Sequence, residues 1–331
     1  MKNIGKLGIG PMSKEVVEAA FCYSQEQNEP LMLIATKNQV DYDGGYVNNW
    51  TTKAYMDYVK QLKQKYPKAK ISVCRDHLGP GFKNDDLSDV YKTIDADIEY
   101  GFDLIHVDYC HYKGSRQQLL EESKKAIEYI LKKRPEMLLE VGTDENTGAF
   151  LEDVSRIGED MEFFSKIAPL QFFVVQTGTI VKEVNQAGSF NQKFIEKIKP
   201  LADKYNVGIK EHNCDYIEAQ NLKERKSLVA AVNVAPQFGV VQTALTLQKA
   251  FTYGIDPAEF LKAAYQSGKW QKWLHKSNEH NKFLCSLIAG HYVFAGGAYK
   301  KLYEKINRHE NFRETVIAEV MKNFDIYIKN L

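Results

Sequence analysis

Short apolar runs alternate with amphipathic segments along the first three quarters of the chain. The runs that predict buried strands cover residues 7–10, 31–35, 71–74, 104–108, 138–141, 172–175, 207–210 and 229–234. Segments with apolar residues at helical spacing follow at 13–27, 51–66, 87–100, 115–133, 153–167, 191–205 and 237–253, and a short helix follows the seventh strand. Eight strands alternate with eight helices, and most of the strands are apolar on both faces. This pattern predicts a parallel sheet covered by helices.

The length of this repeat favours a closed barrel. About 250 residues is the usual size of a (β/α)₈ TIM barrel, so we expect an α/β barrel over residues 1–254. A doubly wound open sheet is the competing architecture. The first predicted strand is not followed by G-x-G-x-x-G, and the chain has no Walker loop, which argues against a nucleotide-binding fold.

Residues 255–331 predict a helical extension that begins at Asp256-Pro257, an N-cap and first-turn pair. This segment is rich in aromatic residues, including Trp270, Trp273 and Tyr292. Aromatic residues at helical spacing usually pack in a core. We therefore expect the extension to pack on the barrel or at the subunit interface of a homo-oligomer.

Composition excludes several classes of function. The chain has 331 residues, 44% hydrophobic and 26% charged, with a formal net charge of +1 and no long block of one sign. This balance argues against binding to nucleic acid or to a membrane surface. Five scattered cysteines without a C-x-x-C pair, and a first segment without a signal-like apolar region, predict a cytoplasmic protein with reduced thiols.

Polar side chains gather where the predicted strands end. In chain order they are Asn38 and Gln39, Asp76 and His77, His106 and Asp108, Glu140 with Asp144 and Glu145, Gln176, and His212 with Asp215. Each has an ordinary explanation when taken alone; Asp215, for example, could cap the helix that follows it. A barrel, however, places the carboxyl ends of all its strands on one rim. The pattern therefore predicts a site there.

The residue types at this rim suit a divalent metal ion. Two imidazoles and a carboxylate, completed by an amide oxygen or water, are typical ligands of Zn²⁺ or a similar ion such as Mn²⁺. The predicted ligands are His77 and His212, joined by Asp144 or its neighbours Glu145 and Glu140, and by Gln176.

Six motifs resemble one enzyme family. They are Asn38-Gln39-Val40 with Gly44-Gly45-Tyr46, Asp76-His77-Leu78-Gly79-Pro80, Ile105-His106-Val107-Asp108, Gly142-Thr143-Asp144, Gln176-Thr177-Gly178 and His212-Asn213-Cys214-Asp215-Tyr216. In their order and spacing they resemble the Z-type subunit family of class II D-tagatose-1,6-bisphosphate aldolases. The resemblance spans about residues 7–250. It implies a TIM barrel related to the class II fructose-bisphosphate aldolases, whose zinc polarises a ketose carbonyl.

The resemblance also implies a reaction and roles for residues. We expect a metal-dependent enzyme that acts on a ketose or ketose phosphate by retro-aldol and aldol chemistry through an enediolate. The outcome is aldol cleavage or C4 epimerisation, and proton-transfer epimerisation is a third variant. The expected acid/base is Asp76, with Glu145 or Glu140 as the alternative. The expected substrate-binding residues are Asn38, Gln39, His106 and Asp108, with a phosphate held near Asn213 or Asn233.

Two departures from the family leave the substrate open. The chain is shorter around the fifth predicted strand. The family's Ser-Asp-Arg-x-Arg-Tyr-Tyr-Trp stretch is replaced by 289–294, in which both arginines are missing. Arginines are the usual clamps for phosphate groups, so a bisphosphorylated substrate does not follow from the resemblance.

A role without catalysis is the other hypothesis. Z-type subunits have been regarded as partners that stabilise a catalytic aldolase subunit, and the aromatic extension would then form the interface between the two. A pure scaffold, however, has no physical need for Asp76, His77 and His212 together.

Overall fold

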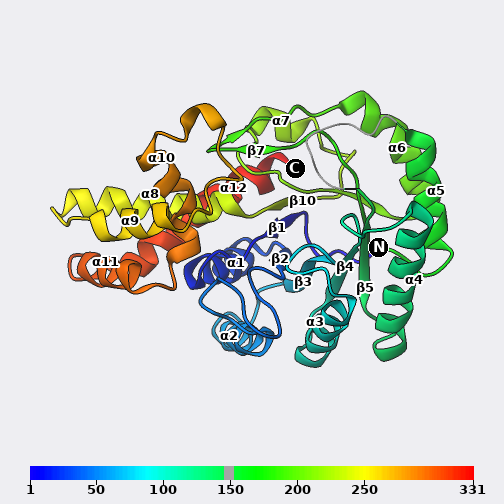
Figure 1. Ribbon diagram of the computed structural model, residues 1–331, viewed down its shortest axis with the longest axis horizontal. Helices are drawn as coiled ribbons and strands as arrows, with labels where there is room; N and C mark the ends of the chain where they lie inside the picture. The colour runs from blue at the N-terminus through cyan, green and yellow to red at the C-terminus, as the bar shows by residue number, and fades with distance from the viewer. Residues whose placement is uncertain (145–152) are drawn as a thin grey trace.

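The computed structural model describes residues 1–144 and 153–331, and within them eight parallel strands close into a barrel (Figure 1). The order around the barrel is β1-β10-β9-β6-β5-β4-β3-β2. The strands are β1 (Leu7–Ile9), β2 (Leu31–Thr36), β3 (Ile71–Leu78), β4 (Leu104–Asp108), β5 (Leu138–Gly142), β6 (Phe172–Val174), β9 (Gly208–Glu211) and β10 (Ala231–Val234). The predicted TIM barrel is confirmed, and the open sheet is excluded.

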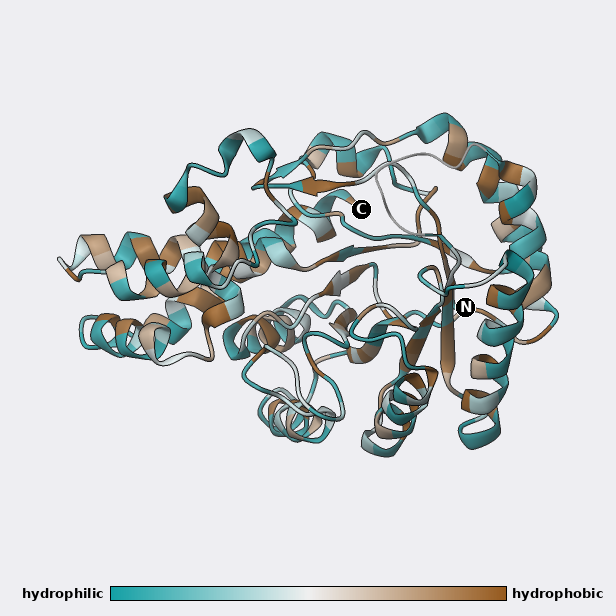
Figure 2. Cartoon of the chain, in the orientation of Figure 1, coloured by the Kyte–Doolittle hydropathy of each residue, from teal (hydrophilic) through white to brown (hydrophobic). Residues whose placement is uncertain are grey.

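Helices surround the barrel. They are α1 (Lys14–Gln27), α2 (Thr52–Lys65), α3 (Leu87–Tyr100), α4 (Arg116–Lys133), α5 (Val154–Ser165), α6 (Gln192–Lys204), the short α7 (Ala219–Lys223) and α8 (Pro236–Thr252). Side-chain oxygens of Ser13, Thr51 and Ser115 accept backbone N–H groups at the first turns of α1, α2 and α4, which fixes where these helices begin. Figure 2 shows hydrophobic strands at the centre and helices with many hydrophilic residues around them.

The third strand is longer than predicted. We expected it to end at Cys74, but β3 continues to Leu78 and includes Asp76 and His77. Its register against β4 shifts between Arg75 and Leu78, and His77 has a φ of +51°. A non-glycine residue in this left-handed region is uncommon, and such a backbone irregularity re-aims side chains. As a result, the consecutive Asp76 and His77 both face the barrel interior, where a regular strand would place them on opposite faces.

Arg75 points the other way, toward the helix layer. Its Nε and Nη2 atoms donate to the two carboxylate oxygens of Asp97 on α3, each at 2.7 Å. Nη1 donates to the carbonyl oxygens of Ala35 and Val40 at 3.0 and 2.6 Å. Both charged side chains are fully buried. This pair ties the bulged end of β3 to α3 and to the end of β2.

A small hairpin lies in the loop after β6. Its strands β7 (Val181–Lys182) and β8 (Asn185–Gln186) are antiparallel. Gln186 Nε2 donates to the carbonyl oxygens of Asn213 and Asp215, at 2.8 and 3.1 Å. The hairpin thus holds the loop that follows β9.

The C-terminal segment is helical, as expected. It contains α9 (Ala258–Gln266), the 3₁₀ turns η1 (Lys276–Asn278) and η2 (Gly290–Val293), α10 (Lys282–Ala289), α11 (Gly297–Asn307) and α12 (Phe312–Asn330). Helix α12 packs against α1 and α8, whereas α9, α10 and α11 extend beside α8 on the left of Figure 1. The loop between α9 and η1 also contacts the β7–β8 hairpin, because the backbone N–H of Glu183 donates to the carbonyl oxygen of Trp273 at 2.7 Å.

The division into two domains at residue 254 stays a prediction. In the described part of the chain, no helix is long and apolar enough to cross a membrane.

His291, in η2, makes the extension sensitive to acid. Its ring is buried, and neither ring nitrogen has a hydrogen-bond partner among the described residues. Burial, together with the nearby Lys272 charge, lowers the pKa of His291 to about 3. Histidine in an unfolded chain has a pKa of about 6.5, so between about pH 3 and 6.5 the unfolded state binds the extra proton. The contribution of the neutral His291 ring to the free energy of unfolding is therefore fully present above pH 6.5. It is lost progressively as the pH falls from 6.5 toward 3.

We expect wild-type protein to lose about 2 kcal/mol more stability than His291→Phe between pH 7 and pH 5. Urea denaturation at the two pH values measures this difference. His309→Phe is the matched control, since His309 is exposed and stacks on Tyr253, and it should follow wild type. Equal pH dependence of wild type and His291→Phe would contradict the prediction.

Candidate metal and active site

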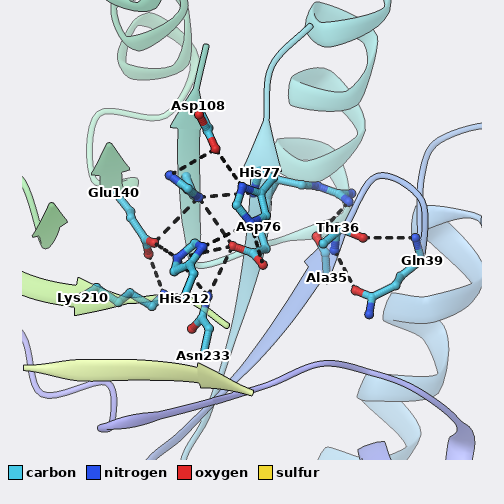
Figure 3. Close-up of polar contacts among 12 residues, drawn as sticks. Ala35, Thr36, Gln39, Asp76, His77, Asp108, Glu140, Lys210, His212 and Asn233 are labelled. Carbon is cyan, nitrogen blue, oxygen red and sulfur yellow. Dashed lines mark hydrogen bonds and ion pairs between the residues drawn. The ribbon is translucent and has the colours of Figure 1, made fainter. Parts of the chain in front are cut away.

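Four residues at the carboxyl ends of the barrel strands form a compact cluster. Asp76, His77, His106 and His212 each offer one ligand atom, and these atoms lie within 4.8 Å of one another. They come from β3, β4 and the residue after β9, and Figure 3 shows Asp76, His77 and His212 turned toward one another. Three of the side chains are at most 8% exposed, whereas that of His77 is 26% exposed. Solvent therefore reaches the cluster past His77.

His77 is oriented by Asp108. The Nδ1–H group of His77 donates to Asp108 Oδ2 at 2.7 Å, which leaves Nε2 facing His212 Nδ1 at 3.1 Å. Burial alone would lower the pKa of His77, but the Asp76 and Asp108 charges raise it to about 9. Burial alone would raise the pKa of Asp108, but its hydrogen bond to His77 and the neighbouring His106 hold it at about 2. Without a metal, His77 is an imidazolium ion bound to a carboxylate.

His212 lies against a second buried carboxylate. Its Nε2 atom is 3.0 Å from Glu140 Oε1, and Glu140 Oε2 accepts a hydrogen bond from Lys210 Nζ at 2.6 Å. Burial is the main cause that lowers the pKa of His212, so this ring is neutral. Burial alone would raise the pKa of Glu140, but Lys210, His106 and His212 hold it at about 2.

Asp76 is an ionised carboxylate at the centre of the cluster. Oδ1 accepts a hydrogen bond from Asn233 Nδ2 at 3.3 Å and lies 3.4 Å from His106 Nδ1, while Oδ2 lies 3.8 Å from His77 Nε2. Burial would raise the pKa of Asp76, but the positive charge of His77, helped by the neighbouring His106, holds it well below its ordinary value. Asp76 is therefore ionised, and its Oδ2 atom, which is turned toward His77, can accept a proton.

Two buried polar atoms beside the cluster lack hydrogen-bond partners among the described residues. The backbone N–H of His77 donates to His106 Nδ1 at 3.2 Å, which places the His106 proton on Nε2. That atom has no hydrogen-bond partner in the described part of the chain, since Asp108 Oδ2 is 4.0 Å away. Asn233 Oδ1 is also unpaired. Gly142 makes room for the His106 ring, since a Cβ atom at this position would lie 2.8 Å from Nε2. Buried unpaired groups are unusual, and a ligand with hydroxyl groups would satisfy both.

The donor set fits a zinc-like divalent ion. Three imidazoles and one carboxylate are the ligand types that zinc prefers. The 3.1 Å separation between His77 Nε2 and His212 Nδ1 is close to the roughly 3.3 Å between two nitrogens of one tetrahedral zinc ion. The cluster includes the predicted ligands His77 and His212.

The remaining predicted ligands lie elsewhere or outside the described residues. Asp144 forms an ion pair with Arg156 and accepts a hydrogen bond from Thr143 Oγ1 at 3.1 Å, and it is not part of the cluster. Gln176 is buried two residues after β6. Glu145, the alternative acid/base, falls outside the described residues. The ligand roles of Asp144 and Gln176 stay predictions.

The predicted substrate-binding residues divide into two groups. Asp108, His106 and Asn233 lie in or beside the cluster. The other two lie in the loop after β2: Asn38 donates to the carbonyl oxygen of Phe82, and Gln39 Oε1 accepts the Thr36 N–H at 2.9 Å (Figure 3). Their amide groups hold the loop together.

Asp215 has the structural role that the sequence left open, but at a different helix. Oδ1 accepts the N–H groups of Ala235 and Gln237 at 3.1 and 2.7 Å and so caps the first turn of α8.

Sequence reasoning missed two residues of the site. Lys210 contacts Glu140 inside the barrel, and the Phe82 ring lies 4.8 Å from that of His77 at the rim. For Lys210 a signal was available, because it stands two positions before His212 in an apolar strand and so shares its inward face. Phe82 lies in an irregular loop, where no periodicity indicates its direction.

Comparison with known proteins agrees with this geometry. The family model of D-tagatose-1,6-bisphosphate aldolase subunit GatZ/KbaZ-like proteins matches residues 2–146. The curated D-tagatose-1,6-bisphosphate aldolase subunit GatZ of Klebsiella pneumoniae subsp. pneumoniae is 31% identical over 114 residues, which is 32% of this chain and 27% of that protein. The match thus spans about a quarter of the length of this relative.

Solved structures share the fold. A crystal structure described as a probable tagatose 6 phosphate kinase from Sinorhizobium meliloti 1021 has a TM-score of 0.80 at 19% identity, covering 99% of this chain and 100% of that one. Fructose-bisphosphate aldolase from Campylobacter jejuni has a TM-score of 0.58 at 14% identity, covering 91% and 90%. The YdjI aldolase from Escherichia coli K12 has a TM-score of 0.52 at 12% identity, covering 90% and 93%. At these identities the likeness establishes the barrel and not the reaction.

Proposed function

We propose that this chain, whose residues 2–146 match the family model of GatZ/KbaZ-like D-tagatose-1,6-bisphosphate aldolase subunits, is a metal-dependent enzyme of aldol chemistry. Its substrate would be a ketose or ketose phosphate, and the outcome cleavage or inversion at C4. The observation that carries this proposal is the cluster of Asp76, His77, His106 and His212 at the carboxyl rim of a TIM barrel.

His77 and His212 would hold the divalent ion, and a carboxylate such as the predicted Asp144 would supply the third protein ligand. When bound, such an ion supplies Lewis-acid stabilisation of negative charge that develops on the oxygens of a ketose. The hydrogen bond from His77 Nδ1 to Asp108 keeps the ring in one orientation, as is usual for a metal-binding histidine.

Asp76 is the proposed proton acceptor. Its Oδ1 atom is engaged by Asn233, and Oδ2 is the atom free to take the proton from the hydroxyl group whose C–C bond breaks. The low pKa keeps this carboxylate ionised at neutral pH, as a general base requires. His106 Nε2–H and Asn233 Oδ1 would bind hydroxyl groups of the sugar, because both are buried and unpaired.

The region that carries arginines in the family offers no phosphate clamp here. Residues 289–294 form the end of α10 and η2, and they contribute the buried His291 and the neighbouring Tyr292. Tyr292 lies 4.7 Å from Tyr46 of the loop after β2. Free ketoses are therefore as good candidates for the substrate as phosphorylated ketoses.

The decisive experiment incubates metal-loaded protein with free and phosphorylated ketoses. NMR would follow the release of a triose and inversion at C4. One of these products from at least one ketose supports the proposal, and the absence of both from every ketose contradicts it.

Asp76→Asn should retain metal and lower kcat by about 100- to 10,000-fold, because the amide cannot accept the proton. Metal content and turnover, measured on the same sample, test this directly. Asp85→Asn is a matched control in the loop after β3, where Asp85 forms an exposed ion pair with Lys113. Unchanged turnover of Asp76→Asn would rule out the assigned role.

A stabilising, non-catalytic subunit is the alternative, because the Klebsiella relative is itself described as a subunit. Metal analysis of the purified chain separates the two possibilities. Stoichiometric zinc or manganese with turnover by the chain alone supports the enzyme. Turnover that requires a second, aldolase chain supports the scaffold.

A further inference from the structure

We infer that the buried Lys210–Glu140 pair positions His212, so that this ring offers Nδ1, and not Nε2, to the metal ion. The inference deepens the proposed function and rests on it for the metal, but the orientation of the ring can be measured separately. Lys210 stands two positions before His212 and shares its inward face.

The pair is built into the interior of the barrel. Lys210 and Glu140 are on β9 and β5, and their side chains are 1% and 0% exposed. Lys210 Nζ lies 2.6 Å from Glu140 Oε2 and also 5.1 Å from the centre of the Phe172 ring. A buried ammonium group needs this carboxylate, and the carboxylate in turn is held in one place by it.

The second oxygen of Glu140 determines the proton on His212. Glu140 Oε1 is 3.0 Å from His212 Nε2, and an ionised carboxylate can only accept hydrogen bonds. His212 Nε2 must therefore carry a proton. Asn233 Nδ2 also lies 3.1 Å from Nε2, but one of its two N–H groups has Asp76 Oδ1 as its acceptor, whereas the ionised Glu140 has no hydrogen to donate and can contact Nε2 only as an acceptor.

With Nε2 protonated, the lone pair of His212 is on Nδ1. That atom faces His77 Nε2 at 3.1 Å, and His77 Nε2 is the nitrogen left over after Nδ1 has bonded to Asp108. Each ring is thus held by a carboxylate on its far side: Asp108 for His77 and Glu140 for His212 (Figure 3). The two carboxylates present one nitrogen of each ring to the same point.

The first test reads the ring directly. Long-range ¹H–¹⁵N NMR of protein with ¹⁵N-labelled histidine identifies the protonated nitrogen of each ring, and His212→Gln assigns the signal among eight histidines. We expect Nε2–H on His212 in metal-free protein, and a shift of its Nδ1 signal on addition of zinc. A proton on Nδ1, coordination through Nε2 or no shift with zinc would overturn the inference, whatever the turnover is.

The second test compares two double variants that remove both charges together, so that neither leaves a buried charge unpaired. Lys210→Met with Glu140→Gln keeps an acceptor for His212 Nε2–H, while Lys210→Met with Glu140→Leu removes it. We expect the Leu double variant to bind zinc about 10- to 100-fold more weakly than wild type, and the Gln double variant to fall between the two.

A matched control separates a specific loss of zinc affinity from a general loss of stability. Lys37→Met with Asp89→Asn breaks another buried ion pair, between the loop after β2 and α3, and should leave zinc affinity unchanged. Equal zinc affinity in the Gln and Leu double variants would overturn the inference. Loss of turnover with the expected NMR and affinity results would instead count against the proposed reaction alone.

Discussion

Replacing His77 with alanine should weaken zinc binding by about 100- to 1,000-fold, because it removes a ligand and the ring that faces His212 Nδ1. His77 is also the member of the cluster that is open to solvent, so the metal enters past it. Competition with a chromogenic chelator measures the affinity, and elemental analysis measures the amount of bound metal.

The control for this variant is His111→Ala. His111 also contacts Phe82, edge to face with ring centres 4.8 Å apart, but it does not belong to the cluster. Its removal should leave metal affinity unchanged while altering the same part of the rim. Equal zinc affinity of His77→Ala and wild type would remove His77 from the ligand set and with it the basis of the proposed chemistry.

The largest effect on stability is expected at Arg75. In Arg75→Met the carboxylate of Asp97 stays buried without its partner, and the carbonyl groups of Ala35 and Val40 each lose a donor. Breaking one partner of a buried pair costs about 3–5 kcal/mol of the free energy of unfolding. Urea denaturation at neutral pH measures this loss.

An exposed pair provides the comparison. Lys53 and Asp57 lie one turn apart on α2 with side chains 63% and 44% exposed, and such pairs contribute about 0.3–0.5 kcal/mol. Lys53→Met should therefore be nearly neutral. If Arg75→Met lost no more stability than Lys53→Met, the buried pair would not be what anchors the end of β3.

The alternation of strands and helices was readable because each strand is apolar and each helix is amphipathic over a short range. β4 (Leu104–Asp108) and α3 (Leu87–Tyr100), for example, have the predicted bounds. β3 was predicted too short for a physical reason. Arg75 and Asp76 are charged, and only the distant Asp97 and the barrel interior make it possible to bury them in a strand.

The site was predictable in outline for the same reason that the barrel was. Parallel strands bring their carboxyl ends together, so Asp76, His77 and His212 could be placed on one rim. The hydrogen-bond partners of these residues could not be predicted, because they depend on contacts between distant parts of the chain, such as that of Glu140 with Lys210, 70 residues apart. Likewise, nothing in the local pattern indicates that Asp144 pairs with Arg156.

The bulge in β3 has a consequence for how such a barrel can diversify. Asp76 and His77 are covalent neighbours, so the spacing between the proton acceptor and the metal-holding ring is set by one peptide unit in a strand anchored through Arg75. The loops after β2 and β5 can change in length or sequence without altering that spacing. Relatives could thus exchange the parts that recognise a sugar and keep the reacting pair as an inherited unit.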